Sequence, residues 1–214
     1  MLELGVKTLL AYGLGAILGS LVLGRLRKVD IRTLGSGNAG GTNALRTQGV
    51  GFGIAVLLID ILKGIIAVKV LPGLALPGIE PDRLVSREWL TVCCAAAVVL
   101  GHVYPIWFDF RGGKGAATVV GVVASLHPWT LIPLLATWLG VLMLTGFVGL
   151  ATMLAGVVLV IAVWLRTPDD LPFLLLSVAF AAFIIYTHRS NISRMLQGTE
   201  NRARRLWLLR PRSS

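Results

Sequence analysis

The segment Gly101-His-Val-Tyr-Pro-Ile-Trp-Phe-Asp-Phe-Arg-Gly-Gly-Lys-Gly-Ala-Ala-Thr118 is a polar island between two apolar runs. Gly112, Gly113 and Gly115 leave the backbone uncovered and free to reach positive φ, so that successive N–H groups can converge on an anion. Lys114 adds a full positive charge, and the helix expected directly after it would bring its positive dipole end to the same place. We therefore predict a phosphate-binding loop at a membrane surface. The alternative is a plain glycine turn.

The composition of the chain places this loop in a membrane protein. Of the 214 residues, 56% are hydrophobic and only 14% are charged, and the mean hydropathy is +0.82, which is too apolar for a soluble domain. The net charge of +10 does not indicate a nucleic-acid partner, because the basic residues lie between apolar runs and in the C-terminal tail. Cys93 and Cys94 are adjacent inside an apolar run, where we expect buried thiols and no disulfide.

Seven apolar runs are candidate membrane spans. They lie near residues 4–24, 50–71, 88–104, 116–127, 129–144, 149–166 and 173–187. The fourth is shorter than the ~20 residues that a perpendicular helix needs, and the first lacks a basic region before it, so we expect a retained helix rather than a cleaved signal. The sequence predicts an all-α integral membrane protein with seven transmembrane helices, forming a single domain over residues 1–214.

The distribution of basic residues predicts the orientation of these spans. One side carries fourteen: Arg25, Arg27, Lys28, Arg32, Arg46, Arg111, Lys114, Arg189, Arg194, Arg202, Arg204, Arg205, Arg210 and Arg212. The other side carries four: Lys7, Arg83, Arg87 and Arg166. Because Lys and Arg concentrate in cytoplasmic loops, we expect the N-terminus outside, the C-terminus in the cytoplasm and every unusual polar segment on the cytoplasmic face.

A second polar segment, Gly-Ser-Gly-Asn-Ala-Gly-Gly-Thr-Asn at residues 35–43, follows the first apolar run. Irregular backbone at membrane depth survives only where it is packed in protein or lines a wet cavity. Its small polar side chains can bind a polyhydroxylated or anionic ligand, and the following arginine offers a bidentate fork for phosphate. The candidate binding residues are Ser36, Gly37, Asn38, Thr42, Asn43 and Arg46. A structural turn is the alternative.

The ionisable residues within or at the ends of the apolar runs include an aspartate, a lysine and a histidine with a possible role. Asp60 and Lys63 are spaced i and i+3, so they share one face of a helix, where we expect a structural ion pair or contact with an aqueous cavity. His102 lies at the end of the third run and is a candidate substrate contact, with a hydrogen-bonded structural histidine as the more frequent case.

A third polar segment runs from His188 to Glu200 where the last apolar run ends. If the helix continues, His188, Asn191 and Arg194 recur at i, i+3 and i+6 and share one side. The arginines of the tail that follows, with Trp207 among them, are more simply an anchor to anionic lipid head groups.

These three segments resemble the acyl-phosphate-dependent glycerol-3-phosphate acyltransferases of bacteria, the PlsY family. That family is similar in having Ser-Gly-Asn-x-Gly-x-Thr-Asn, matched at residues 36–43, and Gly-His-x-x-Pro with Gly-Gly-Lys-Gly-x-Ala-Thr, matched at residues 101–118. Its third motif, His-x-x-Asn-Ile-x-Arg with Gly-x-Glu, is matched at residues 188–200.

The resemblance implies transfer of a fatty acyl group from acyl phosphate to the 1-hydroxyl of glycerol 3-phosphate, giving lysophosphatidate and inorganic phosphate. It also implies a catalytic cleft on the cytoplasmic face of the inner membrane and no metal, CoA or other cofactor. Membrane lipids are the other expected partners, and a monomer is expected. Carried over by motif, Lys114 with the Gly112–Gly115 backbone, Ser36 and Arg46 would hold phosphate groups, while Asn38, Asn43, His188 and Asn191 would orient glycerol 3-phosphate. His188, Lys114 and Asn191 are the predicted catalytic residues.

The chain departs from the family pattern at Gly149, where members often carry serine, and Thr152 is a partial substitute for that hydroxyl. Either His188 or the substrate phosphate can accept the proton of the attacking hydroxyl. A transporter or binder of organic phosphates is the chief rival, although the chain shows no internal repeat. A scaffold for lipid-synthesis enzymes is the second rival.

Overall fold

Helices make up the regular secondary structure of the part of the protein that the structure describes. The computed structural model describes residues 1–204 and 206–209, and nearly every apolar run forms a helix there. Within those ranges the only strand-like pairing is an isolated bridge between Leu76 and Ile79. The expected all-α class is therefore confirmed.

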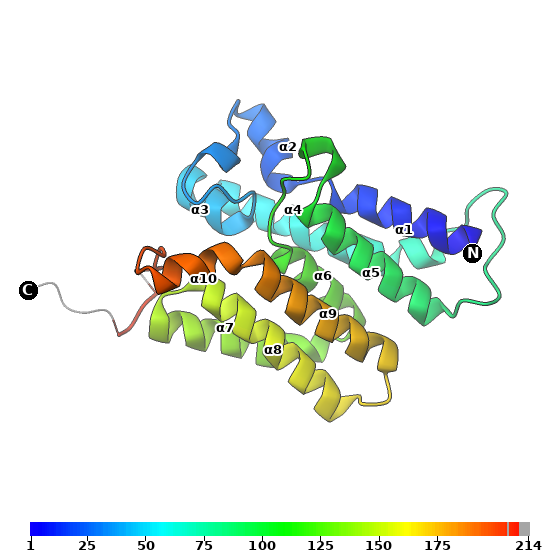
Figure 1. Cartoon of the computed structure of the whole chain (residues 1–214). Coiled ribbons are helices and arrows are strands. Elements are labelled where there is room, and N and C mark those ends of the chain that lie inside the picture. The colour runs from blue at the N-terminus through cyan, green and yellow to red at the C-terminus, as the bar shows by residue number, and fades with distance from the viewer. Residues whose placement is uncertain (205, 210–214) are drawn as a thin grey trace, which may run out of the picture. The chain divides into compact units, whose positions relative to one another are not determined.

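The chain divides into two compact units, Met1–Pro128 and Trp129–Ser214, each of which is described by itself. The single domain expected from the sequence stays a prediction. The helices of the first unit, blue to green in Figure 1, are α1 (Leu2–Gly15), α2 (Gly19–Leu26), η1 (Ile31–Thr33), α3 (Gly41–Gln48), α4 (Val50–Lys69), η2 (Leu71–Gly73), α5 (Arg87–Val103), η3 (Ile106–Phe108) and α6 (Ala116–Leu126).

The helices of the first unit approach one another closely through glycine. A Cβ on Gly101 of α5 would lie 2.1 Å from the carbonyl oxygen of Tyr12 in α1, and a Cβ on Gly121 of α6 would lie 2.1 Å from that of Ile61 in α4. Only glycine permits such contacts, which is the packing expected for helices in a membrane. Figure 1 shows α1 and α5 running side by side.

The first apolar run does not form one straight helix. The α1 and α2 helices are bent by 46° across residues 16–18. The bend releases backbone carbonyls at the end of α1, and in an apolar environment these must find donors. The Lys63 ammonium on α4 supplies them, since its Nζ donates to the carbonyl oxygens of Gly15 and Ile17 at 2.8 and 3.0 Å.

The second unit is an antiparallel arrangement of apolar helices followed by a polar one. Its helices, yellow-green to red in Figure 1, are α7 (Leu131–Thr145), α8 (Val148–Arg166), α9 (Leu171–Thr187) and α10 (Arg189–Leu196). A short 3-10 helix, η4 (Pro128–Thr130), precedes α7. Gly146 ends α7 with a left-handed φ of 76°, and Asp170 caps α9 by accepting from the N–H of Phe173 at 3.1 Å.

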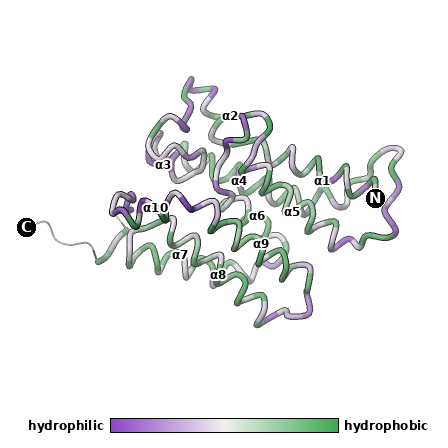
Figure 2. Tube along the Cα trace, viewed as in Figure 1, coloured by the Kyte–Doolittle hydropathy of each residue, from purple (hydrophilic) through white to green (hydrophobic). Residues whose placement is uncertain are grey.

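Among the residues that the structure describes, three helices are long and apolar enough to cross a membrane, or up to five if each bent pair counts as one span. The bent pairs are α1 with α2, at 46°, and α9 with α10, at 49°. The α6 helix, which coincides with the fourth expected span, has only 11 residues. Figure 2 shows the apolar colour along the long helices and the polar colour on α3, α10 and the loop before α5. The count of seven spans and the orientation of the termini stay predictions.

The tail is engaged with its own unit more than the sequence indicated. The Arg202 guanidinium lies over the rings of Phe147 and Trp207, at 4.3 and 4.2 Å from their centroids, and the Trp207 Nε1 donates to the carbonyl oxygen of Leu144 at 3.0 Å. These two residues therefore pack on the turn between α7 and α8, and their expected role as a lipid anchor stays a prediction. Arg205, Arg210 and Arg212 of the same expected anchor lie outside the described residues.

Candidate functional site

The segment at residues 35–43 is a turn built around one asparagine. Asn43 is 1% exposed, and its Nδ2 donates to the carbonyl oxygens of Ile31, Leu34 and Asn38 at 2.9 to 3.0 Å. Its Oδ1 accepts from the N–H of Ser36 at 3.0 Å. The amide thus satisfies the irregular backbone that the glycines create. The sequence predicted that the Asn43 amide binds a ligand. In the structure the oxygen and nitrogen of that amide instead form hydrogen bonds within the loop.

The other polar side chains of this loop remain available. Four of them form no hydrogen bond or ion pair within the described parts of the chain: the side chains of Ser36, Asn38, Thr42 and Arg46. Thr42 and Arg46 are exposed on α3, and Ser36 and Asn38 are partly exposed before it. Gly37, with a φ of 72°, makes the turn between them. The loop therefore presents two hydroxyls, an amide and a guanidinium, which suits a phosphorylated polyol.

The glycine loop at residues 112–115 differs from the anion cradle expected from its sequence. The N–H groups of Gly112 and Gly113 donate to the carbonyl oxygens of Val103 and His102, both at 3.1 Å. Neither glycine has a positive φ. The expected convergence of these two N–H groups on an anion is wrong, because the loop folds back on the end of α5 and uses them there.

Two features beside this loop still favour an anion, namely Lys114 and the start of α6. Gly115 has a φ of 87° and forms the N-cap of α6, so the amides of Ala116 to Thr118 lie in the first turn of an 11-residue helix. First-turn amides have no partner within the helix and carry the positive end of its dipole. Lys114 is partly exposed directly before them. The predicted pairing of a lysine with a helix N-terminus is thus present.

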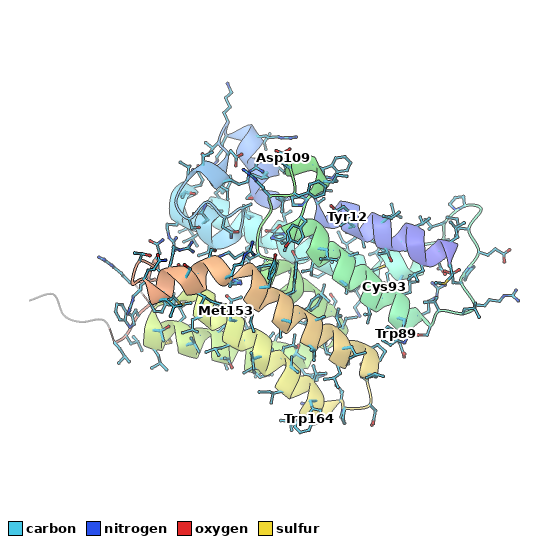
Figure 3. All side chains as sticks on the ribbon, viewed as in Figure 1. Tyr12, Trp89, Cys93, Asp109, Met153 and Trp164 are labelled. Atoms are coloured by element: carbon cyan, nitrogen blue, oxygen red, sulfur yellow. The ribbon has the colours of Figure 1, made fainter. Side chains whose placement is uncertain are left out.

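The first two polar segments are held together in the first unit. Phe108, in the loop after α5, packs against a buried apolar group that includes Ala39. The Arg32 Nη1 donates to the carbonyl oxygens of Phe108 and Arg111 at 3.1 and 3.3 Å. The same guanidinium holds the pKa of Asp30 below its ordinary value by hydrogen bonding to the carboxylate. Figure 3 shows Asp109 on this loop.

Asp60 and Lys63 pair with each other, as expected from their spacing. The Lys63 Nζ lies 3.2 Å from the Asp60 Oδ1, and both side chains are at most 3% exposed. His102 joins them, because its Nδ1 lies 2.8 Å from the Lys63 Nζ. His102 is 2% exposed, which places it beneath the glycine loop rather than on its surface.

The third segment belongs to the second unit, and its helix does not continue as expected. The α9 helix ends at Thr187 and α10 begins at Arg189, with a bend of 49° between them. His188 occupies the bend, and its Nδ1 lies 2.7 Å from the carbonyl oxygen of Ile184. A carbonyl oxygen only accepts, so the Nδ1 carries a proton and the Nε2 is the acceptor of the neutral ring.

Asn191 and Arg194 of α10 share one carboxylate. The Asn191 Nδ2 donates to Glu200 Oε1 at 2.7 Å, and the Arg194 Nε donates to Glu200 Oε2 at 2.6 Å. Glu200 was not among the predicted site residues, although it ends the third motif. The signal that could have found it is the glycine two residues earlier, Gly198, which has a φ of 69° and turns the chain back toward α10.

Gly149 is the departure from the family pattern, and its surroundings explain why glycine is suitable here. A Cβ at this position would lie 3.0 Å from the Cβ, Cγ and Nδ2 of Asn191. Thr152 does not replace the missing hydroxyl, because its Oγ1 donates to the carbonyl oxygen of Val148 at 2.9 Å and lies 3.2 Å from the Trp138 Nε1. Across residues 1–204 and 206–209, no group of three His, Cys, Asp or Glu side chains could hold a metal ion.

Comparison with known proteins shows which family the chain belongs to. The family described as glycerol-3-phosphate acyltransferase matches residues 6–198. The glycerol-3-phosphate acyltransferase of Halalkalibacterium halodurans is 40% identical over 90% of this chain and 91% of its own. That of Synechococcus elongatus is 38% identical over 94% and 95% of the two chains.

Solved structures show the same similarity. The crystal structure of PlsY, an integral membrane glycerol 3-phosphate acyltransferase, in its glycerol 3-phosphate form is 35% identical, with a TM-score of 0.80 over 93% of this chain and 94% of that one. Its lysophosphatidic acid form gives 34% identity and a TM-score of 0.79. With a family match across nearly its whole length and relatives well above 30% identity, the chain belongs to the glycerol-3-phosphate acyltransferase family, the PlsY family of integral membrane proteins.

Proposed function

We propose that the protein transfers a fatty acyl group from acyl phosphate to the 1-hydroxyl of glycerol 3-phosphate, giving lysophosphatidate and inorganic phosphate. The observation that carries this proposal is the near full-length likeness to PlsY, whose two solved forms hold glycerol 3-phosphate and lysophosphatidic acid, the acceptor and the product of this transfer. Acyl phosphate as donor is supported by the resemblance of the three motifs. The sequence also lacks the H-x4-D pattern of CoA- or carrier-dependent glycerol acyltransferases.

In the first unit we assign phosphate binding to Lys114, the first-turn amides of α6, Arg46 and Ser36. Each supplies a cation or a hydrogen-bond donor, and charge-assisted bonds to phosphate are among the strongest in proteins. Asn38 and Thr42 contact glycerol 3-phosphate. The other predicted site residues of this unit fix the shape of the two loops and do not contact the ligand. Asn43 and Gly37 shape the first loop, and Gly112, Gly113 and Gly115 shape the second.

In the second unit we assign the acceptor hydroxyl to His188 and Asn191. His188 presents its Nε2 as an acceptor, because the Nδ1 is bonded to Ile184. Asn191 is held by Glu200 with Arg194 on the other carboxylate oxygen, so its amide is fixed before substrate arrives. Pre-organised donors and acceptors of this kind cost no reorganisation during the reaction.

The transfer needs no covalent intermediate on the enzyme. The 1-hydroxyl oxygen of glycerol 3-phosphate forms a bond to the acyl carbon, and the bond from that carbon to the phosphate oxygen breaks. The phosphate leaves with the electron pair. Acyl phosphate is an activated mixed anhydride, so positioning can supply about 7–11 kcal/mol and neutralisation of the departing phosphate supplies much of the remainder. The hydroxyl proton goes to the His188 Nε2 or to the substrate phosphate, whose second pKa is about 6.

We place this reaction at the cytoplasmic face of the inner membrane, in a monomer with its N-terminus outside. The uneven distribution of basic residues supports this orientation, because fourteen lie in the segments assigned to the cytoplasm and four in those assigned to the outside.

The test is to incubate the purified protein with acyl phosphate and glycerol 3-phosphate and to measure release of phosphate and lysophosphatidate. Formation of both products is expected, and Lys114→Met should lower kcat/KM by about 100-fold. Lys69→Met, which removes an exposed lysine at the end of α4, is the matched control and should retain the rate. Binding of glycerol 3-phosphate without turnover would instead support the transporter alternative.

A further inference from the structure

The proposed reaction gives no role to a group of three buried ionisable residues next to the glycine loop. Asp60, Lys63 and His102 are 1%, 3% and 2% exposed, within the helices α4 and α5. Burying ionised groups is costly unless they are paired and hydrogen-bonded, and at membrane depth such groups usually serve function.

The hydrogen bonds of Lys63 account for all three of its N–H groups. Two are donated to the carbonyl oxygens of Gly15 and Ile17, at 2.8 and 3.0 Å, where α1 breaks from α2. The third is directed to the His102 Nδ1 at 2.8 Å. The Lys63 Nζ also lies 3.2 Å from the Asp60 Oδ1, and the His102 Nδ1 lies 3.5 Å from the same oxygen, so the three side chains form one cluster. Because a charged Lys63 ammonium can only donate, the His102 Nδ1 accepts from it, and the proton of the neutral ring is then on Nε2.

The opposite edge of the His102 ring contacts the glycine loop. A Cβ on Gly113 would lie 2.1 Å from the His102 Nε2, so the ring packs directly against this glycine. The N–H of Gly113 donates to the His102 carbonyl oxygen at 3.1 Å. Both the ring and the backbone of one residue thus fix Gly113, the residue immediately before Lys114.

A second buried ion pair in the same unit provides a reference. Glu3 and Lys7 are 5% and 2% exposed, and the Lys7 Nζ donates to Glu3 Oε1 and to the carbonyl oxygen of Pro72, both at 2.7 Å. Glu3 also accepts from Arg87 at 2.6 Å. This pair joins the first turns of α1 and α5 to the segment after α4. Like Asp60 and Lys63, it is a buried pair of a carboxylate and a lysine ammonium, but it does not contact the glycine loop.

We propose that Asp60, Lys63 and His102 are positioning residues for the reaction. They tie the break between α1 and α2 to Gly113, and through it they set the place of Lys114 and of the first turn of α6. The inference rests on the proposed function, since phosphate binding at Lys114 is what the three residues control. A displacement of about 1 Å at such a site can cost about 100-fold in rate.

The first experiment compares two double variants that each remove a buried ion pair. Asp60→Asn with Lys63→Met removes both charges of the buried pair. Glu3→Gln with Lys7→Met removes the pair at the other end of α1, where the remaining Arg87 side chain is 55% exposed and can be solvated. Melting temperatures in detergent and kcat/KM for both substrates are measured. We expect similar melting temperatures, an about 100-fold lower kcat/KM for the first variant and near-normal kinetics for the second. Equal kinetics for the two would overturn the proposal. A wild-type protein without product would overturn the proposed function instead.

The second experiment separates positioning from a merely structural role. If the three residues act through Lys114, adding the Asp60→Asn and Lys63→Met changes to Lys114→Met costs little further rate, because coupled residues are not additive. Gly113→Ala should lower kcat/KM through the clash with Nε2, and His102→Asn, which lacks Nε2 and Cε1, should partly restore it. Independent, multiplicative losses in both combinations would overturn the proposal.

Discussion

The two buried histidines both lie where an apolar helix ends, and the structure gives their ring nitrogens opposite hydrogen-bonding roles. At the end of α5 the His102 Nδ1 faces the Lys63 ammonium and accepts, so its Nε2 carries the proton and faces Gly113. At the bend between α9 and α10 the His188 Nδ1 faces the carbonyl oxygen of Ile184 and donates, so its Nε2 accepts. The partner of Nδ1, rather than the motif, decides which ring can take a proton from a substrate.

The largest expected effect concerns His188 and tests the comparison directly. If its Nε2 is the general base, His188→Ala lowers kcat at least ~100-fold at saturating concentrations of both substrates. Phosphate release by the purified protein is the measurement, with the melting temperature as a check on folding. A near-normal rate would assign the proton to the substrate phosphate and remove the chemical distinction between the two histidines.

A smaller effect is expected at Glu200, which fixes the residues that follow His188. Glu200→Gln keeps one oxygen as a possible acceptor for Asn191 but cannot satisfy Asn191 and Arg194 together, so one hydrogen bond to a charged group is lost. Such a bond contributes about 1.5–3 kcal/mol, and we expect at least an about tenfold lower kcat/KM. Glu88→Gln, on the exposed first turn of α5, is the control. Equal kinetics for the two variants would show that the Asn191 amide does not depend on Glu200.

The outcomes at these residues show what the sequence could and could not establish. Apolar runs predicted helices correctly, and the i, i+3 spacing of Asp60 and Lys63 predicted their pairing, because both are local properties. The two bends were missed, since hydropathy does not reveal where i to i−4 hydrogen bonds are broken. Gly113 was assigned to anion binding because its sequence could not reveal the His102 ring beside it. The sequence located the polar segments, but it could not show which of their groups form hydrogen bonds within the protein.

Gly149 offers a finer change in the region of His188. In Gly149→Ala the new Cβ would lie 3.0 Å from three atoms of the Asn191 side chain, which must move by a few tenths of an ångström. We expect a few-fold loss in kcat/KM, because overpacking shifts a positioned group without unfolding the protein. Gly156→Ala is the matched control on the same helix, since its Cβ would lie 3.5 Å from Ala181, an ordinary contact. A rate for Gly149→Ala as high as that of the control would mean that the position of Asn191 tolerates such a shift.

The smallest effect is expected at Asp30, which pairs with Arg32 beside the loop after α5. It should change the stability of the protein rather than the rate of the reaction. Arg32 lowers the pKa of Asp30 from 3.8 by hydrogen bonding to the carboxylate. A carboxyl whose pKa is lower in the folded state stabilises the protein above its unfolded pKa, and this contribution is lost as the pH falls through the folded value.

Asn can still accept the backbone N–H of Arg32, so Asp30→Asn isolates the charge. Because the Asp30 side chain is 40% exposed, the loss at pH 7 should stay below about 1 kcal/mol. Melting temperatures in detergent should differ slightly at neutral pH and converge in acid. A difference that grows on acidification would contradict the assignment. We also expect Asp30→Asn to retain activity at neutral pH, because the hydrogen bonds from Arg32 to Phe108 and Arg111 do not require Asp30. Retained activity would mean that the position of the glycine loop depends on the buried His102 and not on the exposed Asp30.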